Sequence, residues 1–315
     1  WHRSTNDHFL DLEVVALTPL LLTQRAAIGY ATVRYRRLTR RNEDETPMSD
    51  DAARPADHKE RVRHQFGRTA QDYVTSERHR SGRDLDRLVE LAEPGPDDEA
   101  LDIATGGGHT ALALAPHVRH VVASDLTPAM LQAAEGFIRG EKGVKNVSFE
   151  IAEAEHLPFA DASFDIVSCR IAPHHFDDIR AFCREVARVL RPGGRFVLID
   201  SLAPEDDELD AFINEVEWRR DTTHVRAYKL SEWRAFVEDA GLVVDAVEPF
   251  QRRYEYQSWT ARSRMTEAGK DELDQLILTA PDHVLEAFAI DIDEGAIQSL
   301  DDNKLLLRAR KPAAT

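Results

Sequence analysis

Three consecutive glycines lie between an apolar run and a helix-compatible run, within residues Ala100 to Ala111. Glycine is favoured at such a turn when a ligand lies against the backbone, where a Cβ atom would collide with it. The spacing of Gly106, Gly108 and Ala111 also satisfies the fingerprint of dinucleotide-binding loops. The loop alone therefore predicts a ligand at a helix start, without deciding which cofactor it is.

Two aspartates flank this loop. Asp102 lies four residues before Gly106, where its carboxylate can attract a cationic amino acid group and would repel a pyrophosphate. Asp125 ends the apolar run that begins at Val121, where it is placed to accept hydrogen bonds from two ribose hydroxyls. Asp125 would serve a dinucleotide equally well, so Asp102 is the residue that favours a cationic cofactor.

A second polar group, from Cys169 to Phe176, follows the fourth predicted strand. In a parallel sheet this position lies at the carboxyl edge, beside the predicted cofactor loop, where ligands bind. His174 and His175 can remove a proton near neutral pH, which suits a phenol, a hydroxyl or an activated carbon acid. Alternatively, one histidine packs under the next helix and the other orients the loop. Arg170 pairs either with an acidic substrate group or with a structural carboxylate, and we favour the structural pairing.

The histidine spacing does not favour a metal site. His174 and His175 are adjacent, so on a helix their side chains would point about 100° apart. The sequence contains neither an HExxH nor a CxxC spacing. We therefore predict that no metal ion is required.

Three further segments have no reason to occur in a dinucleotide-binding fold: Ala152 to Phe159, Ser163 to Ser168, and Val189 to Arg195 with its Pro-Gly-Gly turn. With the glycine loop and Asp125, they resemble the class I S-adenosylmethionine-dependent methyltransferases, particularly the ubiquinone/menaquinone-biosynthesis type and its uncharacterised bacterial relatives. The resemblance extends from about Phe66 to the C-terminus. It implies an α/β fold with a doubly wound, mostly parallel, seven-stranded Rossmann-like sheet and a C-terminal lid insertion.

The resemblance also implies the contacts of the cofactor, S-adenosyl-L-methionine. Asp102 and the glycine-loop backbone would hold the methionine portion, and Asp125 the ribose. Leu126 and Met130 would contact the adenine face, while Ala154 would offer a backbone N–H to the ring. The full set of implied cofactor residues is Tyr73, Asp102, Ala104, Thr105, Gly106, Gly108, His109, Asp125, Leu126, Met130, Glu153, Ala154, Glu155 and Arg170.

Tyr73 resembles an aromatic residue that closes over the cofactor, and a helix-packing tyrosine is the alternative. A further charged segment contains Trp218, His224, Arg226 and Tyr228, which we interpret as lid residues over the acceptor. The alternative for that segment is a solvated helix face.

The implied function is transfer of a methyl group to a small molecule, aromatic or quinone-like. The Asn-Pro-Pro-Tyr signature of nucleobase or glutamine amide methylation is absent from the sequence. Two alternatives stay open: a NAD-dependent Rossmann oxidoreductase, and a module that binds S-adenosylmethionine without catalysis. The sequence does not indicate the acceptor, the methylated atom or the oligomeric state.

The elements that must position these residues follow a regular alternation after Pro94. Such alternation predicts a parallel sheet with helices on both faces. Strands are predicted at 99–104, 120–124, 147–151, 164–169 and 194–200, with later strands at 243–247 and 305–308. Helices are predicted at 59–73, 84–91, 108–116, 128–139 and 176–190.

The chain divides into five predicted segments. Residues 1–47 are an N-terminal extension, either upstream of a functional start at Met48 or a genuine helix. The others are helices that cover the cofactor (48–93), the α/β core with acceptor-lid elements from 201 (94–250), a lid insertion (251–303), and the last strand and tail (304–315).

Composition limits the partners. The net charge of −17 over 315 residues repels nucleic acid phosphates. No apolar run approaches the roughly 20 residues needed to span a bilayer. The two cysteines, Cys169 and Cys183, are expected to be core thiols. We therefore expect a cytoplasmic protein whose partner is a small-molecule acceptor, with no nucleic acid and no membrane span.

Overall fold

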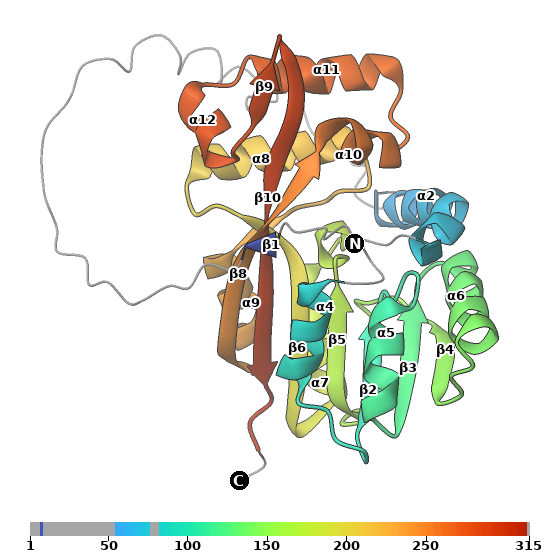
Figure 1. Cartoon of the computed structure of the whole chain (residues 1–315). Helices are drawn as coiled ribbons and strands as arrows, with labels where there is room; N and C mark the ends of the chain where they lie inside the picture. The colour runs from blue at the N-terminus through green and yellow to red at the C-terminus, as the bar shows by residue number, and fades with distance from the viewer. Residues whose placement is uncertain (1–6, 9–53, 76–81, 314–315) are drawn as a thin grey trace, which may run out of the picture.

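The structure is a computed structural model that describes residues 7–8, 54–75 and 82–313. One sheet crosses the molecule with the strand order β1-β8-β10-β6-β5-β2-β3-β4 (Figure 1). Its long strands are β2 (Glu99–Ile103), β3 (His120–Asp125), β4 (Val147–Ile151), β5 (Phe164–Arg170), β6 (Leu190–Ala203), β8 (Val243–Glu255) and β10 (Ala296–Arg310). Short strands β1 (Asp7–His8), β7 (Tyr228–Lys229) and β9 (Asp291–Asp293) pair with β8, β6 and β10.

The predicted doubly wound, mostly parallel sheet is confirmed. Strands β2 to β6 pair in parallel, whereas β10 runs antiparallel between β6 and β8. The parallel strands place their carboxyl ends at one edge, which is where the loops that carry the predicted site residues begin.

The last strand is longer than predicted. It was expected at 305–308 and runs from Ala296 to Arg310, and β8 continues to Glu255 instead of ending near 247. The polar residues Asp302 and Lys304 concealed the strand, because both are buried and paired with each other at 2.5 Å where an apolar run was expected. The two strands therefore reach past the predicted insertion boundaries at 251 and 303, and the segment between them spans 256–295.

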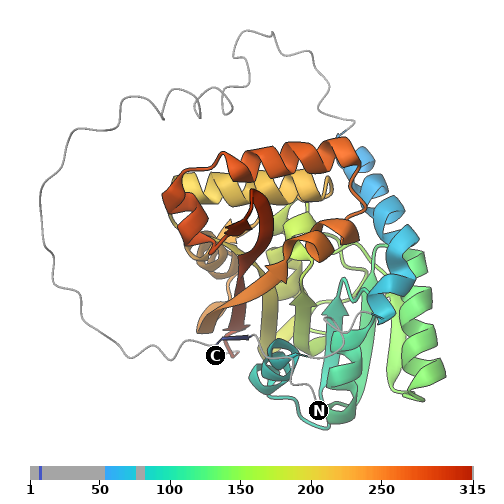
Figure 2. The same cartoon turned by 45° about the horizontal axis from the view of Figure 1, so that its top comes forward.

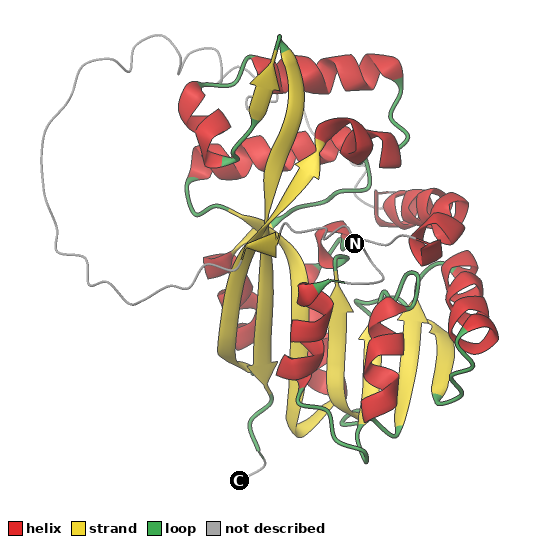
Figure 3. Cartoon of the chain, viewed as in Figure 1, coloured by secondary structure: helices red, strands yellow, loops and turns green. Residues whose placement is uncertain are grey.

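Helices cover both faces of the sheet (Figure 3). On one face, α4 (Arg83–Ala92) and α5 (His109–Leu114) pack Leu88 and Leu114 against Val121 and Leu306. On the other face, α7 (Ile179–Val189) and α9 (Leu230–Asp239) pack their apolar stripes into a cluster that contains Leu305 and Leu307 of β10. Helix α6 (Pro128–Glu135) continues as a π-helical segment over Gly136–Glu141. The two faces thus have separate cores, divided by the alternation of side chains along β10.

The insertion folds with α8 (Asp207–Arg220) into a third apolar cluster beyond the carboxyl edge of the sheet. Figure 2 shows α8 and α11 (Glu267–Leu278) side by side, with α10 (Tyr256–Arg262) and α12 (Asp282–Ala287) beside them. Phe212 and Ile213 of α8 pack with Trp259, Leu273 and Phe288. The insertion is therefore held over the sheet edge by a core of its own.

Helix α2 (Arg54–Thr75) lies beside α6 at the same edge (Figures 1 and 2). It begins five residues before the predicted helix. The side chain of Tyr73 lies outside the described residues, and so does the extension 1–47 apart from Asp7–His8. In the part of the chain that is described, no helix is long and apolar enough to cross a membrane.

We predict that Gly108→Ala destabilises the fold. Gly108 has φ +81°, and an added Cβ would lie 2.8 Å from Cδ1 of Ile138 and 3.1 Å from Cβ of Ala134. The left-handed backbone and the overpacking together should lower the free energy of unfolding by about 2 to 4 kcal/mol, measured by chemical denaturation. Gly140→Ala is the matched control, since no atom lies within 4 Å of its added Cβ. Equal stability of the two variants would contradict the packing role.

Candidate cofactor and acceptor sites

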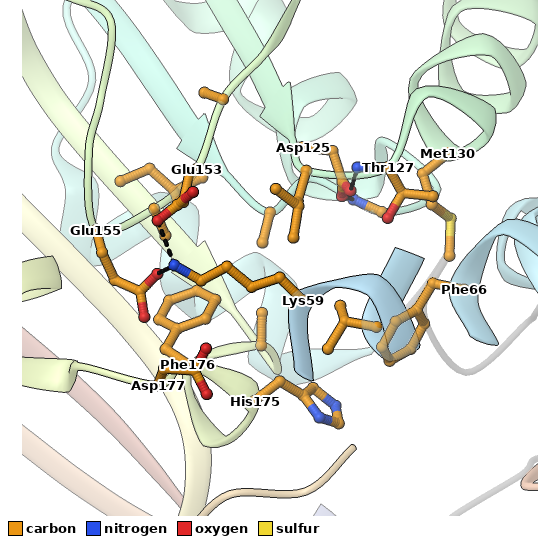
Figure 4. A pocket seen from close by; sticks show the side chains of 18 of the residues that line it. Lys59, Phe66, Asp125, Thr127, Met130, Glu153, Glu155, His175, Phe176 and Asp177 are labelled. Atoms are coloured by element: carbon orange, nitrogen blue, oxygen red, sulfur yellow. Dashed lines mark hydrogen bonds and ion pairs between the residues drawn. The ribbon is translucent and has the colours of Figure 1, made fainter. Parts of the chain in front are cut away.

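A cavity of about 110 Å³ lies at the carboxyl ends of β2 and β3, between the sheet edge and α2 (Figure 4). We call it the cofactor cavity. Its wall includes eight of the residues predicted to bind the cofactor: Ala104, Gly106, Asp125, Leu126, Met130, Glu153, Ala154 and Glu155.

Asp125 is fixed in the cavity wall by the backbone. Its Oδ2 accepts the N–H of Gly106 at 3.0 Å, and its Oδ1 accepts the N–H of Thr127 at 2.8 Å. Burial raises the pKa of Asp125 above its ordinary value, although these hydrogen bonds oppose the rise. The glycine loop and the start of α6 therefore converge on one carboxylate, beside Met130 (Figure 4).

Asp102 lies behind the loop and does not line the cavity. Its Oδ2 accepts the hydroxyl of Thr105 at 2.6 Å, and its Oδ1 accepts the hydroxyl of Ser168 at 2.7 Å. Burial raises the pKa of Asp102 to about 6. Both oxygens are thus used to tie the loop to β5, and the predicted direct attraction of a cationic group is not seen in this geometry. Thr105 likewise serves the loop.

Glycine is required at positions 106 and 108 for different physical reasons. An added Cβ at Gly106, where φ is +54°, would meet no atom within 4 Å, so the loop is open there for a ligand. Gly108 faces Ile138, and His109 packs its buried ring edge-on against Phe137 at 5.2 Å. Gly108 and His109 thus pack against the helix and do not line the cofactor cavity, and their predicted cofactor contacts stay predictions.

Lys59 of α2 crosses the cofactor cavity, and sequence reasoning missed it. Its Nζ forms ion pairs with Glu153 and, at 2.8 Å, with Glu155 (Figure 4). Burial alone would lower the pKa of Lys59, but hydrogen bonds to the two carboxylates raise it. Glu155 also accepts the N–H of Asp178 at 2.8 Å. A lone lysine on a polar helix gave no signal in the sequence, because its partners lie almost a hundred residues away.

Arg170 takes the structural pairing that we favoured. Its Nε and Nη2 donate to Oδ2 of Asp84 at 3.1 and 2.7 Å, and Arg252 approaches Oδ1 of the same carboxylate at 2.9 Å. All three side chains are buried. Arg170 does not line the cofactor cavity, so its predicted place among the cofactor residues is not supported.

His174 and His175 lie together but in different environments. Nδ1 of His174 lies 2.5 Å from Oδ1 of the buried Asp200. Nδ1 of His175 donates to the carbonyl of Thr223 at 2.9 Å, and the carbonyl of His175 accepts from Nε2 of His58 at 3.1 Å. Burial and the neighbouring His174, whose ring lies 4.1 Å away, lower the pKa of His175 to about 4.

A second hollow, of about 820 Å³, opens between α2, α8 and the insertion. We call it the large hollow. His174 lines it, and Phe66, Ile171 and His175 line both this hollow and the cofactor cavity. Ile171 has φ +56°, a rare conformation for a β-branched residue. The two spaces therefore meet at a strained turn that follows β5.

Three of the four predicted lid residues are engaged by other side chains of the protein. Trp218 is exposed, and Arg226 pairs with Asp210 and Glu232. Nε2 of the buried His224 hydrogen-bonds to Asn214 at 3.0 Å. Burial lowers the pKa of His224 to about 3. Tyr228 packs edge-on against Trp233 and Phe236. None of the four lines either space described above, so their lid role stays a prediction. Within the described ranges, no cluster of three or more His, Cys, Asp or Glu side chains could hold a metal ion.

The comparisons with known proteins agree with this geometry. Residues 101–198 match the family described as Methyltransferase domain. A Bacillus subtilis relative named as the uncharacterized methyltransferase YcgJ is 39% identical over 229 residues, which cover 73% of this chain and 90% of that protein. The solved structure of YcgJ superposes with a TM-score of 0.71 at 38% identity, covering 73% of this chain and 99% of that one.

A demethylmenaquinone methyltransferase of Deinococcus radiodurans is 43% identical over 109 residues, or 33% of this chain and 43% of that protein. The shared segment is thus much shorter than the match to YcgJ. Given the extent of that longer match and the glycine loop and Asp125 at the carboxyl edge of the sheet, the chain belongs to the class I S-adenosylmethionine-dependent methyltransferases.

Proposed function

We propose that this methyltransferase acts on a small molecule bound in the large hollow, with an aromatic or quinone-like acceptor as the favoured class. The observation that carries the proposal is the wall shared by the two spaces at Phe66, Ile171 and His175. An acceptor in the large hollow would then lie beside the methyl donor, as an in-line displacement requires. The name of the demethylmenaquinone methyltransferase relative supports the quinone-like class.

The cofactor cavity fits S-adenosylmethionine, which supplies a methyl group made electrophilic by its sulfonium. Gly106 leaves open space beside the loop backbone, and Asp125 offers carboxylate oxygens for ribose hydroxyls. Leu126, Met130 and the Ala154 backbone would hold the adenine. We give Glu153 a second role, since its ion pair with Lys59 holds α2 over the cavity.

We assign His174 as the base for an acceptor that carries a proton. An ionised carboxylate can only accept hydrogen bonds, so the contact with Asp200 places the proton of neutral His174 on Nδ1 and leaves Nε2 as the basic nitrogen. The carboxylate would also stabilise the imidazolium that forms. Asp200 is therefore a positioning residue.

His175 is better suited to hold the site together than to move a proton. It ties the turn after β5 to Thr223 through its side chain and to α2 through its carbonyl, and Phe66 packs edge-on against its ring at 5.1 Å. A pKa of about 4 leaves it neutral and weakly basic near pH 7.

Asp125→Asn should weaken S-adenosylmethionine binding about 10- to 100-fold, because the amide presents one acceptor oxygen in place of two. Calorimetry with the purified protein measures this, and NAD should give no heat. Asp161→Asn is the control, since Asp161 is an exposed residue that pairs with Arg188. Unchanged affinity in a folded Asp125→Asn protein would remove the ribose role.

His174→Gln and Asp200→Asn should each lower turnover about 100-fold or more while leaving S-adenosylmethionine affinity unchanged. The two losses should not add in the double variant, because the residues act as one unit. Transfer of labelled methyl, first across a panel of phenols and hydroquinones and then to the best acceptor, measures turnover. His117→Gln, at an exposed site, is the control. Full activity of His174→Gln would refute the assignment.

Acid should destabilise the wild type more than His175→Asn. The folded-state pKa of His175 is about 4 against an ordinary 6.5, so below about pH 6.5 the unfolded chain takes up a proton that the folded chain refuses. This stabilisation is complete above about pH 6.5 and is lost as the pH falls toward 4. Thermal midpoints across this range should converge in the two proteins as the pH falls. Parallel curves would show that His175 is not held neutral.

A further inference from the structure

The large hollow has a wall rich in cations, although the whole chain carries a net charge of −17. Seven arginine and lysine side chains line it, compared with three carboxylates, those of Glu217, Asp221 and Asp302. Each of these acids is already engaged by a described partner: Arg220 for Glu217, Gln65 for Asp221 and Lys304 for Asp302. The acids in the wall are therefore used to hold the wall in place.

Lys304 keeps donor capacity for an occupant. Its ammonium group is buried and has three N–H donors, of which Ser201 takes one at 2.8 Å and Asp302 another at 2.5 Å. A buried donor that no protein atom satisfies is costly, so an acceptor atom from the occupant is favoured here.

Arg220 and Arg68 extend this donor surface. Arg220 uses Nε and Nη2 on Glu217 and Nη1 on Ser263, which leaves part of its five-donor fork available. Arg68, on α2, has no ion-pair partner among residues 54–75 and 82–313 and is exposed at the rim. These groups only donate, so the matching chemistry is an oxyanion.

Aromatic side chains line the same hollow. The guanidinium carbon of Arg220 lies 4.6 Å from the ring centre of Trp259, and Trp259 stacks with Tyr254 at 6.3 Å. Phe66 and Met265 add apolar surface, with Phe66 at the junction with the cofactor cavity. An occupant with an apolar or aromatic body would thus be flanked by cations, with His174 in the same wall.

We propose that the acceptor is an amphipathic anion: an apolar or aromatic body that carries a carboxylate or phosphate bound by Lys304, Arg220 and Arg68. This rests on the proposed function of the large hollow as the acceptor site. The cations would also stabilise the negative charge that develops on the acceptor as His174 removes its proton.

A matched pair of fluorescent probes tests the proposal: 8-anilinonaphthalene-1-sulfonate and N-phenyl-1-naphthylamine, which lacks the sulfonate. Binding is measured with the cofactor cavity saturated by S-adenosylhomocysteine, so that the probes report on the large hollow. We expect the sulfonate to bind about tenfold more tightly or better, and this preference to weaken as salt is added. Benzoate and phenyl phosphate should displace it, with their ranking separating a carboxylate from a phosphate acceptor, whereas benzamide should not.

Two variants test whether Lys304 and Arg68 cause the preference for the sulfonate probe. Lys304→Met and Arg68→Gln should each reduce sulfonate affinity about three- to tenfold and leave the neutral probe unchanged. Arg68→Gln is on an exposed helix position, so it keeps the test valid if Lys304→Met fails to fold. Arg119→Gln, at the opposite end of β3, is the control.

Equal affinity for the two probes, or a preference that survives both variants, would overturn the proposal. Calorimetry with S-adenosylhomocysteine on the same samples separates this failure from that of the proposed function. Cofactor binding without an anion preference refutes only the acceptor class, whereas no cofactor binding refutes the proposed function itself.

Discussion

The parallel pairing of β2, β3 and β5 is the constraint on which the rest of this site depends. It brings three strand ends to one edge, and with them the loop at Gly106, the carboxylate of Asp125 and the turn at Ile171. The buried Asp102 reinforces this arrangement, because it bonds to Thr105 on its own loop and to Ser168 on the neighbouring strand. A carboxylate that looks like a ligand contact in the sequence here fixes the glycine loop to the neighbouring strand.

The edge is then covered from two directions. Helix α2 lies over the cofactor cavity and is fastened by Lys59 to Glu153 and Glu155. The insertion connects β8 to β10. The pairing of these two strands continues past the carboxyl ends of the parallel strands, and the insertion there forms a separate apolar cluster. Methyl transfer requires that water be kept away from the reacting carbon, and α2 and the insertion lie where they would cover it.

His174, His175 and His224 lie near the junction of the cofactor cavity and the large hollow, and each has different surroundings. His175 and His224 are bound to neutral partners, a carbonyl and an amide, and burial lowers the pKa of both. His174 faces the carboxylate of Asp200. The three imidazoles therefore differ in their partners, and the role proposed for His174 rests on its contact with Asp200.

The sequence by itself determined the sheet and the cofactor loop, because both depend on local patterns. Apolar runs, turn glycines and strand-end acids are read directly from neighbouring residues, and the strands from 99 to 170 lie within about a residue of their predicted positions. It did not reveal the full length of β10, since a buried Lys304–Asp302 pair looks like exposed polar sequence.

Only the tertiary structure decided which residues form the site. Lys59 meets Glu153, His174 meets Asp200, and Arg170 meets Asp84 across separations that no spacing rule covers. The same structure removed Gly108, His109 and Arg170 from the cofactor wall. Long-range pairing and burial, which set the partners and the pKa of each group, exist only once the chain has folded.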